Sequence, residues 1–315
     1  MTSTHPLAGV YAAAVTPLRD ASLNGNRHDS TLDLESVPLL LKFLASRGCH
    51  GAVLFGTTGE GPSFSPSERE ALMRAARDAR DARDQLPGFR LIAGTGTPSL
   101  SETIELTKLA FDLGYEAALV VPPYYFRKAT DDGLFNWFSE LINKAVPSDK
   151  YILGYHFPQV AGIGFSIELL ARLKDSFPTQ FAGIKDSSHD PDLARNLGEK
   201  FGYDLAVLNG TDSYLQLAMQ NKAAGCITAP ANLISPDLRE VWDGMRAGRD
   251  VSAAQERVNK QRHILEQYPF FPATLKALLH RLHGLPRWSV KPPLEELSDE
   301  LAQSAEEQMK TFVAT

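Results

Sequence analysis

Residues 51–82 read GAVLFGTTGEGPSFSPSEREALMRAARDARDA, and this stretch contains the unit from which most of the chain is built. Its first residues, Gly51–Gly56, are almost continuously apolar, as in a strand that is covered on both faces. The segment Pro66–Ala82 spaces its apolar residues as a helix does. Ser65 is the expected N-cap, and Pro66 occupies the first helical position. A buried strand followed by an amphipathic helix indicates one β/α unit of a parallel sheet.

The strand–helix unit recurs eight times, which predicts an α/β fold, the (β/α)8 TIM barrel. An open doubly wound sheet is the alternative. That fold usually has a glycine fingerprint after its first strand, whereas here the first strand ends VTPL. The expected strands are Gly9–Pro17, Gly51–Gly56, Arg90–Gly94, Ala117–Pro122, Tyr151–Tyr155, Phe181–Lys185, Leu205–Gly210 and Gly225–Thr228. The expected helices are Leu32–Ala45, Pro66–Ala82, Leu100–Leu113, Gly133–Ala145, Ser166–Leu173, Pro191–Phe201, Ser213–Gln220 and Pro236–Met245.

The last part of the chain lacks strand signals. The segments ERVNKQRHILEQY, PATLKALLHRLHG and PLEELSDELAQSAEEQMKTF are each amphipathic. We therefore place the barrel, with the active site, at residues 1–247 and a C-terminal helical annex at residues 248–315. The annex is short for an independent domain, so we expect it to pack on the barrel or to form an oligomer contact.

Composition excludes several functional classes. The 315 residues include 32 Lys+Arg and 38 Asp+Glu, a net charge of −6, which gives no basic surface for nucleic acid or for an anionic membrane. No apolar run reaches the roughly 18 residues that span a bilayer. The two cysteines, Cys49 and Cys226, each stand alone in the sequence, which argues against a disulfide scaffold and against a CxxC zinc site. The first residues resemble neither a signal peptide nor a transit peptide, so we expect a cytoplasmic protein.

In such a barrel the active site lies at the carboxyl ends of the strands. Lys185 closes the apolar run FAGIK, so its stem lies along or inside the barrel. Burying an ammonium group is costly, and a neutral lysine amine attacks a carbonyl to form a Schiff base. The alternative is a lysine that extends to solvent or pairs with Asp186.

Two further strand ends carry groups of use to such chemistry. Tyr155 ends the neighbouring strand, where its phenol could transfer a proton, although it could also be an ordinary tyrosine at the core edge. The turn Gly56–Glu60, GTTGE, could hold a carboxylate with its backbone N–H groups and with the hydroxyls of Thr57 and Thr58. The alternative is a tight turn that only caps the next helix.

Histidines do not form a metal-binding pattern in the sequence. His280 and His283 lie one turn apart on an expected annex helix, but a third ligand is not evident. His156 and His189 lie near the expected mouth without the spacing of metal ligands. We therefore expect neither a metal nor an organic cofactor.

The ordered motifs GTTGE, PPYY, YxxP and GIKDSS together resemble the dihydrodipicolinate synthase / N-acetylneuraminate lyase family of class I pyruvate aldolases. The resemblance runs from Thr16 to Pro292–Ser298, nearly the whole chain. It implies that Lys185 forms the imine with pyruvate or a 2-oxo acid and that Tyr155 transfers the proton. It also implies that Thr57 and Thr58 hold the carboxylate, with Thr57 linking Tyr155 to Tyr125 of a neighbouring subunit.

The same resemblance implies that Gly210 and Ile227 line the pyruvate side of the pocket. Its partners would be pyruvate and a small aldehyde or 2-oxo acid, with no cofactor. Members of the family are usually homotetramers, arranged as dimers of dimers.

One position departs from the synthases of this family, in which an arginine follows the tyrosine–proline motif. Here that position is Val160, which cannot hold a carboxylate. The chain looks more like the 4-hydroxy-2-oxoglutarate and 2-keto-3-deoxy-sugar-acid aldolases. We therefore expect a class I lyase that cleaves or forms a 4-hydroxy-2-oxo acid, with the choice between these two substrates open. His156, Gln159 and Thr211 are candidates for contacting substrate hydroxyls.

Three alternatives remain open. The first is a dihydrodipicolinate synthase, which Val160 disfavours. The second is a sugar-acid dehydratase that keeps the imine but releases no pyruvate. The third is a non-catalytic protein that binds 2-oxo acids, against which the presence of both Lys185 and Tyr155 speaks.

Overall fold

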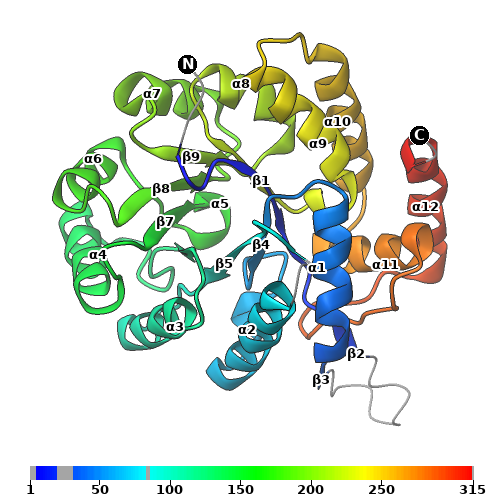
Figure 1. Cartoon of the computed structure of the whole chain (residues 1–315), viewed down its shortest axis with the longest axis horizontal. Coiled ribbons are helices and arrows are strands. Elements are labelled where there is room, and N and C mark those ends of the chain that lie inside the picture. The colour runs from blue at the N-terminus through cyan, green and yellow to red at the C-terminus, as the bar shows by residue number, and fades with distance from the viewer. Residues whose placement is uncertain (1–4, 20–30, 83–85, 314–315) are drawn as a thin grey trace.

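The computed structural model describes residues 5–19, 31–82 and 86–313, and parts of both predicted domains (1–4, 20–30, 83–85 and 314–315) lie outside these ranges. Parallel strands close into a barrel in the order β1-β10-β9-β8-β7-β6-β5-β4, so the predicted (β/α)8 architecture is confirmed. Figure 1 shows these strands at the centre of a ring of helices. The strands are β1 Gly9–Ala13, β4 Gly51–Leu54, β5 Arg90–Gly94, β6 Ala117–Val120, β7 Tyr151–His156, β8 Phe181–Asp186, β9 Ala206–Asn209 and β10 Gly225–Thr228.

The helices fall into two sets. Those that follow barrel strands are α1 Val37–Ser46, α2 Pro66–Asp81, α3 Leu100–Asp112, α4 Asp131–Ala145, α5 Pro158–Ala161, α6 Ile167–Ser176, α7 Pro191–Phe201, α8 Leu215–Gln220 and α9 Ala231–Arg246. The annex helices are α10 Ser252–Leu265, α11 Phe271–His283 and α12 Asp299–Val313. None of the helices within the described ranges is long and apolar enough to cross a bilayer.

Several predicted boundaries are wrong for identifiable reasons. The first strand ends at Ala13 rather than Pro17. Leu32 belongs to a short hairpin of β2 Leu18–Arg19 and β3 Thr31–Leu32, so the next helix begins only at Val37. Helix α9 begins at Ala231 and is kinked at Ile234, two residues before Pro236, which has no N–H to donate.

The start of α2 follows the sequence signal closely. The Ser65 hydroxyl accepts a hydrogen bond from the Glu68 N–H (3.3 Å), and the Glu68 carboxylate accepts one from the Ser65 N–H (2.8 Å). This reciprocal capping box satisfies two backbone donors that the first helical turn leaves unpaired. Because the cap uses neighbouring residues alone, the start of this helix could be predicted from sequence.

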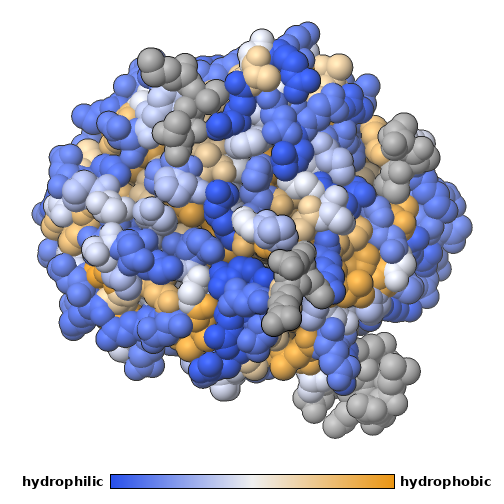
Figure 2. Space-filling view, in the orientation of Figure 1, coloured by the Kyte–Doolittle hydropathy of each residue, from blue (hydrophilic) through white to orange (hydrophobic). Residues whose placement is uncertain are grey.

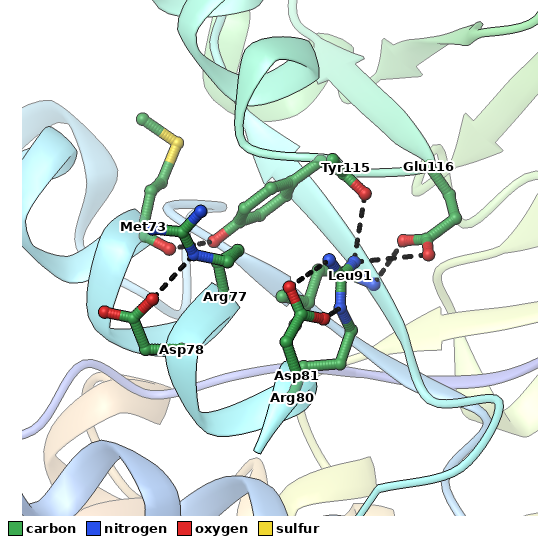
Figure 3. A network of polar contacts seen from close by, with 9 residues as sticks. Met73, Arg77, Asp78, Arg80, Asp81, Leu91, Tyr115 and Glu116 are labelled. Carbon is green, nitrogen blue, oxygen red and sulfur yellow. Dashed lines mark hydrogen bonds and ion pairs between the residues drawn. The ribbon is translucent and has the colours of Figure 1, made fainter. Parts of the chain in front are cut away.

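A polar network joins the middle and the C-terminal end of α2 to the neighbouring strand β5 and to the loop that precedes β6 (Figure 3). The Tyr115 hydroxyl donates to the Met73 carbonyl (3.0 Å), and Arg80 donates to the Gly114 carbonyl (3.0 Å). The Glu116 carboxylate accepts from Arg80 (3.3 Å) and from a backbone N–H of β5 (2.8 Å). These contacts join helix, strand and loop near the amino ends of β5 and β6, away from the mouth, so we assign them a structural role.

Side chains fill the inside of the barrel. Tyr11, Val53, Ile92, Leu153 and Leu208 form one buried cluster there, and larger clusters fill the space between strands and helices. A barrel filled in this way leaves its mouth as the place for a ligand. Figure 2 shows one face of the molecule as mainly hydrophilic, with apolar residues in scattered groups.

The annex is joined to the barrel by buried polar contacts. Lys276 of α11 donates to the Glu60 carboxylate (2.5 Å) and to the Ser289 carbonyl (2.6 Å). Lys276 and Glu60 are almost completely buried, with side-chain exposures of 1% and 0%. The second Glu60 oxygen accepts from the Lys291 N–H (2.7 Å). The turn after β4 is therefore held in place by a segment more than two hundred residues later in the chain.

Candidate active site

Lys185 lies near the carboxyl end of β8, beside Tyr155 of β7, and the two residues are partners in the strand register. Lys185 is 4% exposed, and its Nζ lies 4.2 Å from the centroid of the Tyr155 ring. No hydrogen bond or ion pair joins this Nζ to another residue in the described ranges. The Asp186 carboxylate instead accepts from the Ser188 N–H (2.9 Å). The geometry is thus of a buried amine beside a phenol, rather than of a Lys185–Asp186 pair.

The turn after β4 brings Thr57 to the same point. The Thr57 Oγ1 lies 3.2 Å from the Tyr155 Oη, and either hydroxyl can donate. The backbone N–H groups of Thr57 and Thr58 donate to no residue that the structure describes. Adjacent unpaired N–H groups form an anion-binding concavity, so this turn is suited to a carboxylate.

The turn is held in an unusual backbone conformation. Phe55, which precedes the turn, and Glu60, its last residue, have φ values of 57° and 56°, the left-handed region that residues other than glycine rarely adopt. A Cβ on Gly61 would lie 2.1 Å from the Phe55 carbonyl oxygen, so only glycine fits there. Such strain persists where surrounding contacts impose it, and it concentrates at functional sites.

A cavity of about 260 Å³ opens in front of the lysine. Gly210 forms part of its wall, and a Cβ there would lie 2.0 Å from the Ser187 hydroxyl. The volume suits a small organic acid. The lining residues are Thr57, Thr58, Tyr155, Phe157, Lys185, Ser187, His189, Gly210, Ala229, Arg262, Phe270, Phe271, Pro272 and Leu294.

A second cavity, of about 220 Å³, also adjoins the Thr57–Tyr155 pair. These two residues and Phe157 line both cavities, and Val160 lines only the second. Tyr125 lines neither cavity of its own chain, and its side chain is largely in solvent, at 77% exposure. The structure therefore brings Thr57, Thr58, Tyr155, Lys185 and Gly210 together and leaves Tyr125 outside.

Three other candidate residues do not line the lysine cavity. His156 follows Tyr155 in β7, and because successive side chains of a strand alternate, it points outward. Its Nδ1 accepts from the Phe165 N–H (2.9 Å), and burial lowers the pKa of this imidazole. Ile227 belongs to the packed barrel interior. The Thr211 Oγ1 is buried without a hydrogen-bond partner among the described residues. The structure thus argues against direct substrate contact by His156.

The other polar residues singled out in the sequence are engaged elsewhere. Gln159 donates through Nε2 to the Ser188 carbonyl, and the His280 Nδ1 lies 2.7 Å from the Leu285 carbonyl oxygen. Within the ranges that the structure describes, no group of three or more His, Cys, Asp or Glu residues could hold a metal ion.

Sequence reasoning missed the contribution of the annex to the cavity. Arg262 of α10 and Phe271 of α11 belong to its wall, and His189, placed only near the mouth, lines it as well. Burial, with the nearby Arg262 cation, lowers the pKa of His189. The amphipathic pattern of the annex predicted its helices, but it contained no signal for which side chains would reach the site.

The fold and site define a class, α/β-barrel enzymes that carry a buried lysine amine and a phenol at the barrel mouth. The sequence model of the dihydrodipicolinate synthetase family matches residues 7–312. The chain belongs to this family and is a carbon–carbon lyase of the type that forms a Schiff base on lysine.

Known relatives match over most of their length. An uncharacterized DapA-like lyase of Chloroflexus aurantiacus is 36% identical over 292 residues, covering 93% of this chain and 92% of that protein. A 4-hydroxy-tetrahydrodipicolinate synthase of Thermus thermophilus is 32% identical over 277 residues, covering 86% and 88%. The crystal structure of dihydrodipicolinate synthase from Agrobacterium tumefaciens superposes with a TM-score of 0.82 at 30% identity, covering 96% and 98%.

Proposed function

We propose that this lyase cleaves a 4-hydroxy-2-oxo acid, or forms it in reverse, with pyruvate as one partner and Lys185 as the imine-forming residue. The observation that carries the proposal is the Lys185 amine, buried and without an ion-pair partner among the described residues, 4.2 Å from the Tyr155 ring. An amine in this setting can attack a carbonyl, and the Thr57–Tyr155 pair supplies a proton-transfer group beside it.

The residues divide the reaction between them. The substrate carboxylate binds at the N–H groups of Thr57 and Thr58, and the Lys185 amine adds to C2, releasing the carbonyl oxygen as water. Tyr155 gives its proton to the departing hydroxyl of the carbinolamine, and the resulting phenolate then takes the proton of the C4 hydroxyl. The C3–C4 bond breaks, its electron pair moves toward the iminium to give an enamine, and the aldehyde departs. Protonation at C3 and addition of water release pyruvate and regenerate the lysine.

A second copy of the chain would complete the site. Tyr125 and Phe126 are 77% and 65% exposed, and Val160 nearby is 58% exposed, an arrangement suited to contact with another subunit. The second cavity adjoins the Thr57–Tyr155 pair and could receive Tyr125 of that copy. We therefore propose a homotetramer built as a dimer of dimers. Light scattering after size exclusion should give about four chain masses, whereas a monomer that turns over normally would overturn this part.

Val160 makes the synthase activity the weaker candidate, although named synthases are among the relatives. Its aliphatic side chain faces the second cavity and cannot donate a hydrogen bond to a carboxylate.

Pyruvate release, followed with lactate dehydrogenase, tests the proposal on 2-keto-3-deoxygluconate and 4-hydroxy-2-oxoglutarate. Pyruvate and an aldehyde in equal amounts support the lyase. Consumption of a sugar acid without pyruvate would instead show a dehydratase. A pyruvate imine without turnover of any offered substrate would favour the binding protein.

A further inference from the structure

The annex places a cation in the cavity that contains the lysine. Arg262 of α10 lines this cavity, and its side chain is 8% exposed. Several of its neighbours in the cavity wall are apolar, namely Phe270, Phe271, Pro272 and Leu294. The guanidinium therefore lies in the wall of the cavity that contains Lys185, and the proposed reaction gives it no role.

The contacts of Arg262 leave part of the guanidinium available. Nη1 donates to the Asp212 carboxylate (2.8 Å), and Nε donates to the Glu266 carboxylate (2.6 Å). The Cζ lies 5.0 Å from the centroid of the Phe271 ring. Among the described residues, no acceptor is bonded to Nη2. Because Nε and Nη1 are each bonded to a carboxylate, Nη2, with both of its N–H groups unbonded, is the main donor that Arg262 can offer to a molecule in the cavity.

The position of Arg262 matches the far end of a substrate. The turn that is suited to the carboxylate follows β4, and Asp212, which binds Arg262, follows β9. By the shorter way around the barrel, β1 and β10 lie between β4 and β9. Lys185 lies on β8, next to β9. We take the aldehyde portion of a substrate with its carboxylate at Thr57 and Thr58 to extend toward β9, where Arg262 lines the same cavity as Lys185, rather than toward Val160, which lines only the second cavity.

The local charge decides what kind of group Arg262 can bind. Burial opposes the charge on Arg262, but the Asp212 and Glu266 carboxylates outweigh it and raise the pKa of the guanidinium. Two carboxylates thus already face one cation, and Asp212 is completely buried. Burial and the Arg262 cation lower the pKa of His189, so this neighbour adds little positive charge. A third carboxylate, from a ligand, would be repelled, whereas a neutral hydroxyl accepts a hydrogen bond without adding charge.

We propose that Arg262 is a substrate-binding residue that donates a hydrogen bond through Nη2 to a hydroxyl on the aldehyde portion of the substrate. In doing so it selects a polyhydroxylated 2-oxo acid over a 2-oxo dicarboxylic acid. This inference rests on the proposed function and makes it more specific, since it assigns the substrate to the sugar acids.

The test compares two substrates in the full-length enzyme. The kcat/KM values for 2-keto-3-deoxygluconate and 4-hydroxy-2-oxoglutarate are measured by pyruvate release for the wild type and for Arg262→Lys. Lysine still supplies a positive charge beside Asp212, but its single nitrogen cannot replace the separate donors of the guanidinium. The wild type should prefer the sugar acid. Arg262→Lys should lower kcat/KM for the sugar acid by about 10- to 100-fold, the loss expected for one hydrogen bond to a charged group. The dicarboxylate value should change much less.

Two further variants sharpen the result. Arg257→Lys, on the same helix but bound to Asp237 and Glu240 at the surface, is the matched control and should leave both values unchanged. Asp212→Asn removes one of the two negative charges and should shift the preference toward the dicarboxylate.

The outcomes separate this inference from the function on which it rests. Wild-type protein that is not trapped on Lys185 by pyruvate and borohydride would overturn the proposed function itself. Normal trapping, combined with an unchanged substrate ratio in Arg262→Lys or with a wild-type preference for the dicarboxylate, would overturn the role of Arg262 alone. Normal trapping without turnover of either substrate would also overturn the assignment to sugar acids.

Discussion

The hydroxyl of Thr57 allows a test of how Tyr155 is positioned for proton transfer. Thr57→Val replaces that hydroxyl with a methyl group of similar size and leaves the backbone N–H in place. The lost contact is the 3.2 Å interaction with the Tyr155 hydroxyl. A hydrogen bond to a group that develops charge contributes about 1.5–3 kcal/mol. Since each 1.36 kcal/mol changes a rate about tenfold, kcat should fall about 10- to 100-fold.

The assay separates positioning from binding. Pyruvate release gives kcat and KM, and borohydride trapping gives the fraction of enzyme in the imine form. Thr57→Val should lower kcat while trapping with pyruvate continues, because Lys185 and the N–H groups of the turn are unchanged. Thr57→Ser restores the hydroxyl and should recover most of the activity. Wild-type turnover by Thr57→Val, or a Thr57→Ser enzyme as slow as the valine variant, would refute the reasoning.

Three further predictions concern the frame of the site and its response to pH. Lys276→Met leaves the Glu60 carboxylate buried without its ion-pair partner, so chemical denaturation should show that the free energy of unfolding falls by about 3–5 kcal/mol. Adding Glu60→Gln should restore part of this loss. An unchanged free energy of unfolding would contradict a stabilising role for the ion pair. Gly210→Ala brings a Cβ within 2.0 Å of the Ser187 hydroxyl and should lower both the melting temperature and kcat/KM, with partial rescue by Ser187→Ala; an alanine enzyme as active as the wild type would count against the geometry. The melting temperature should fall from pH 7 to pH 5. Between pH 6.5 and pH 4 the folded protein binds fewer protons than the unfolded chain, so the stability of the fold rises with pH in this window. A melting temperature that does not change with pH would contradict this prediction. The histidines responsible are His5, His50 and His283, whose pKa values are lowered to about 4, mainly by burial.

The fold could be predicted from sequence because its determinants are local. The buried strands are continuous apolar runs, and α2 is capped by Ser65, which immediately precedes it, and by Glu68 in its own first turn. That Lys185 and Tyr155 lie side by side at the mouth could also be predicted, since each lies near the end of such a run and the barrel brings these ends together.

The remaining features depend on contacts that periodicity does not encode. The apolar run ending at Tyr155 extends one residue further as strand, so alternation turns His156 away from the cavity. Arg262 reaches the site because α10 packs beside the loop after β9, where it meets Asp212, fifty residues earlier in the chain. Helix α5 has only four residues, too few for a helical pattern to be recognised.

Trapping of the imine tests the central claim most directly. The protein is incubated with pyruvate, reduced with borohydride, digested and mapped by mass spectrometry. The structure predicts a single reduced pyruvyl adduct on Lys185, lost in Lys185→Met. The fully buried Lys276, paired with Glu60, serves as the internal control and should stay unmodified. A folded protein that gives no adduct, or carries it on another lysine, would contradict the assignment of the site.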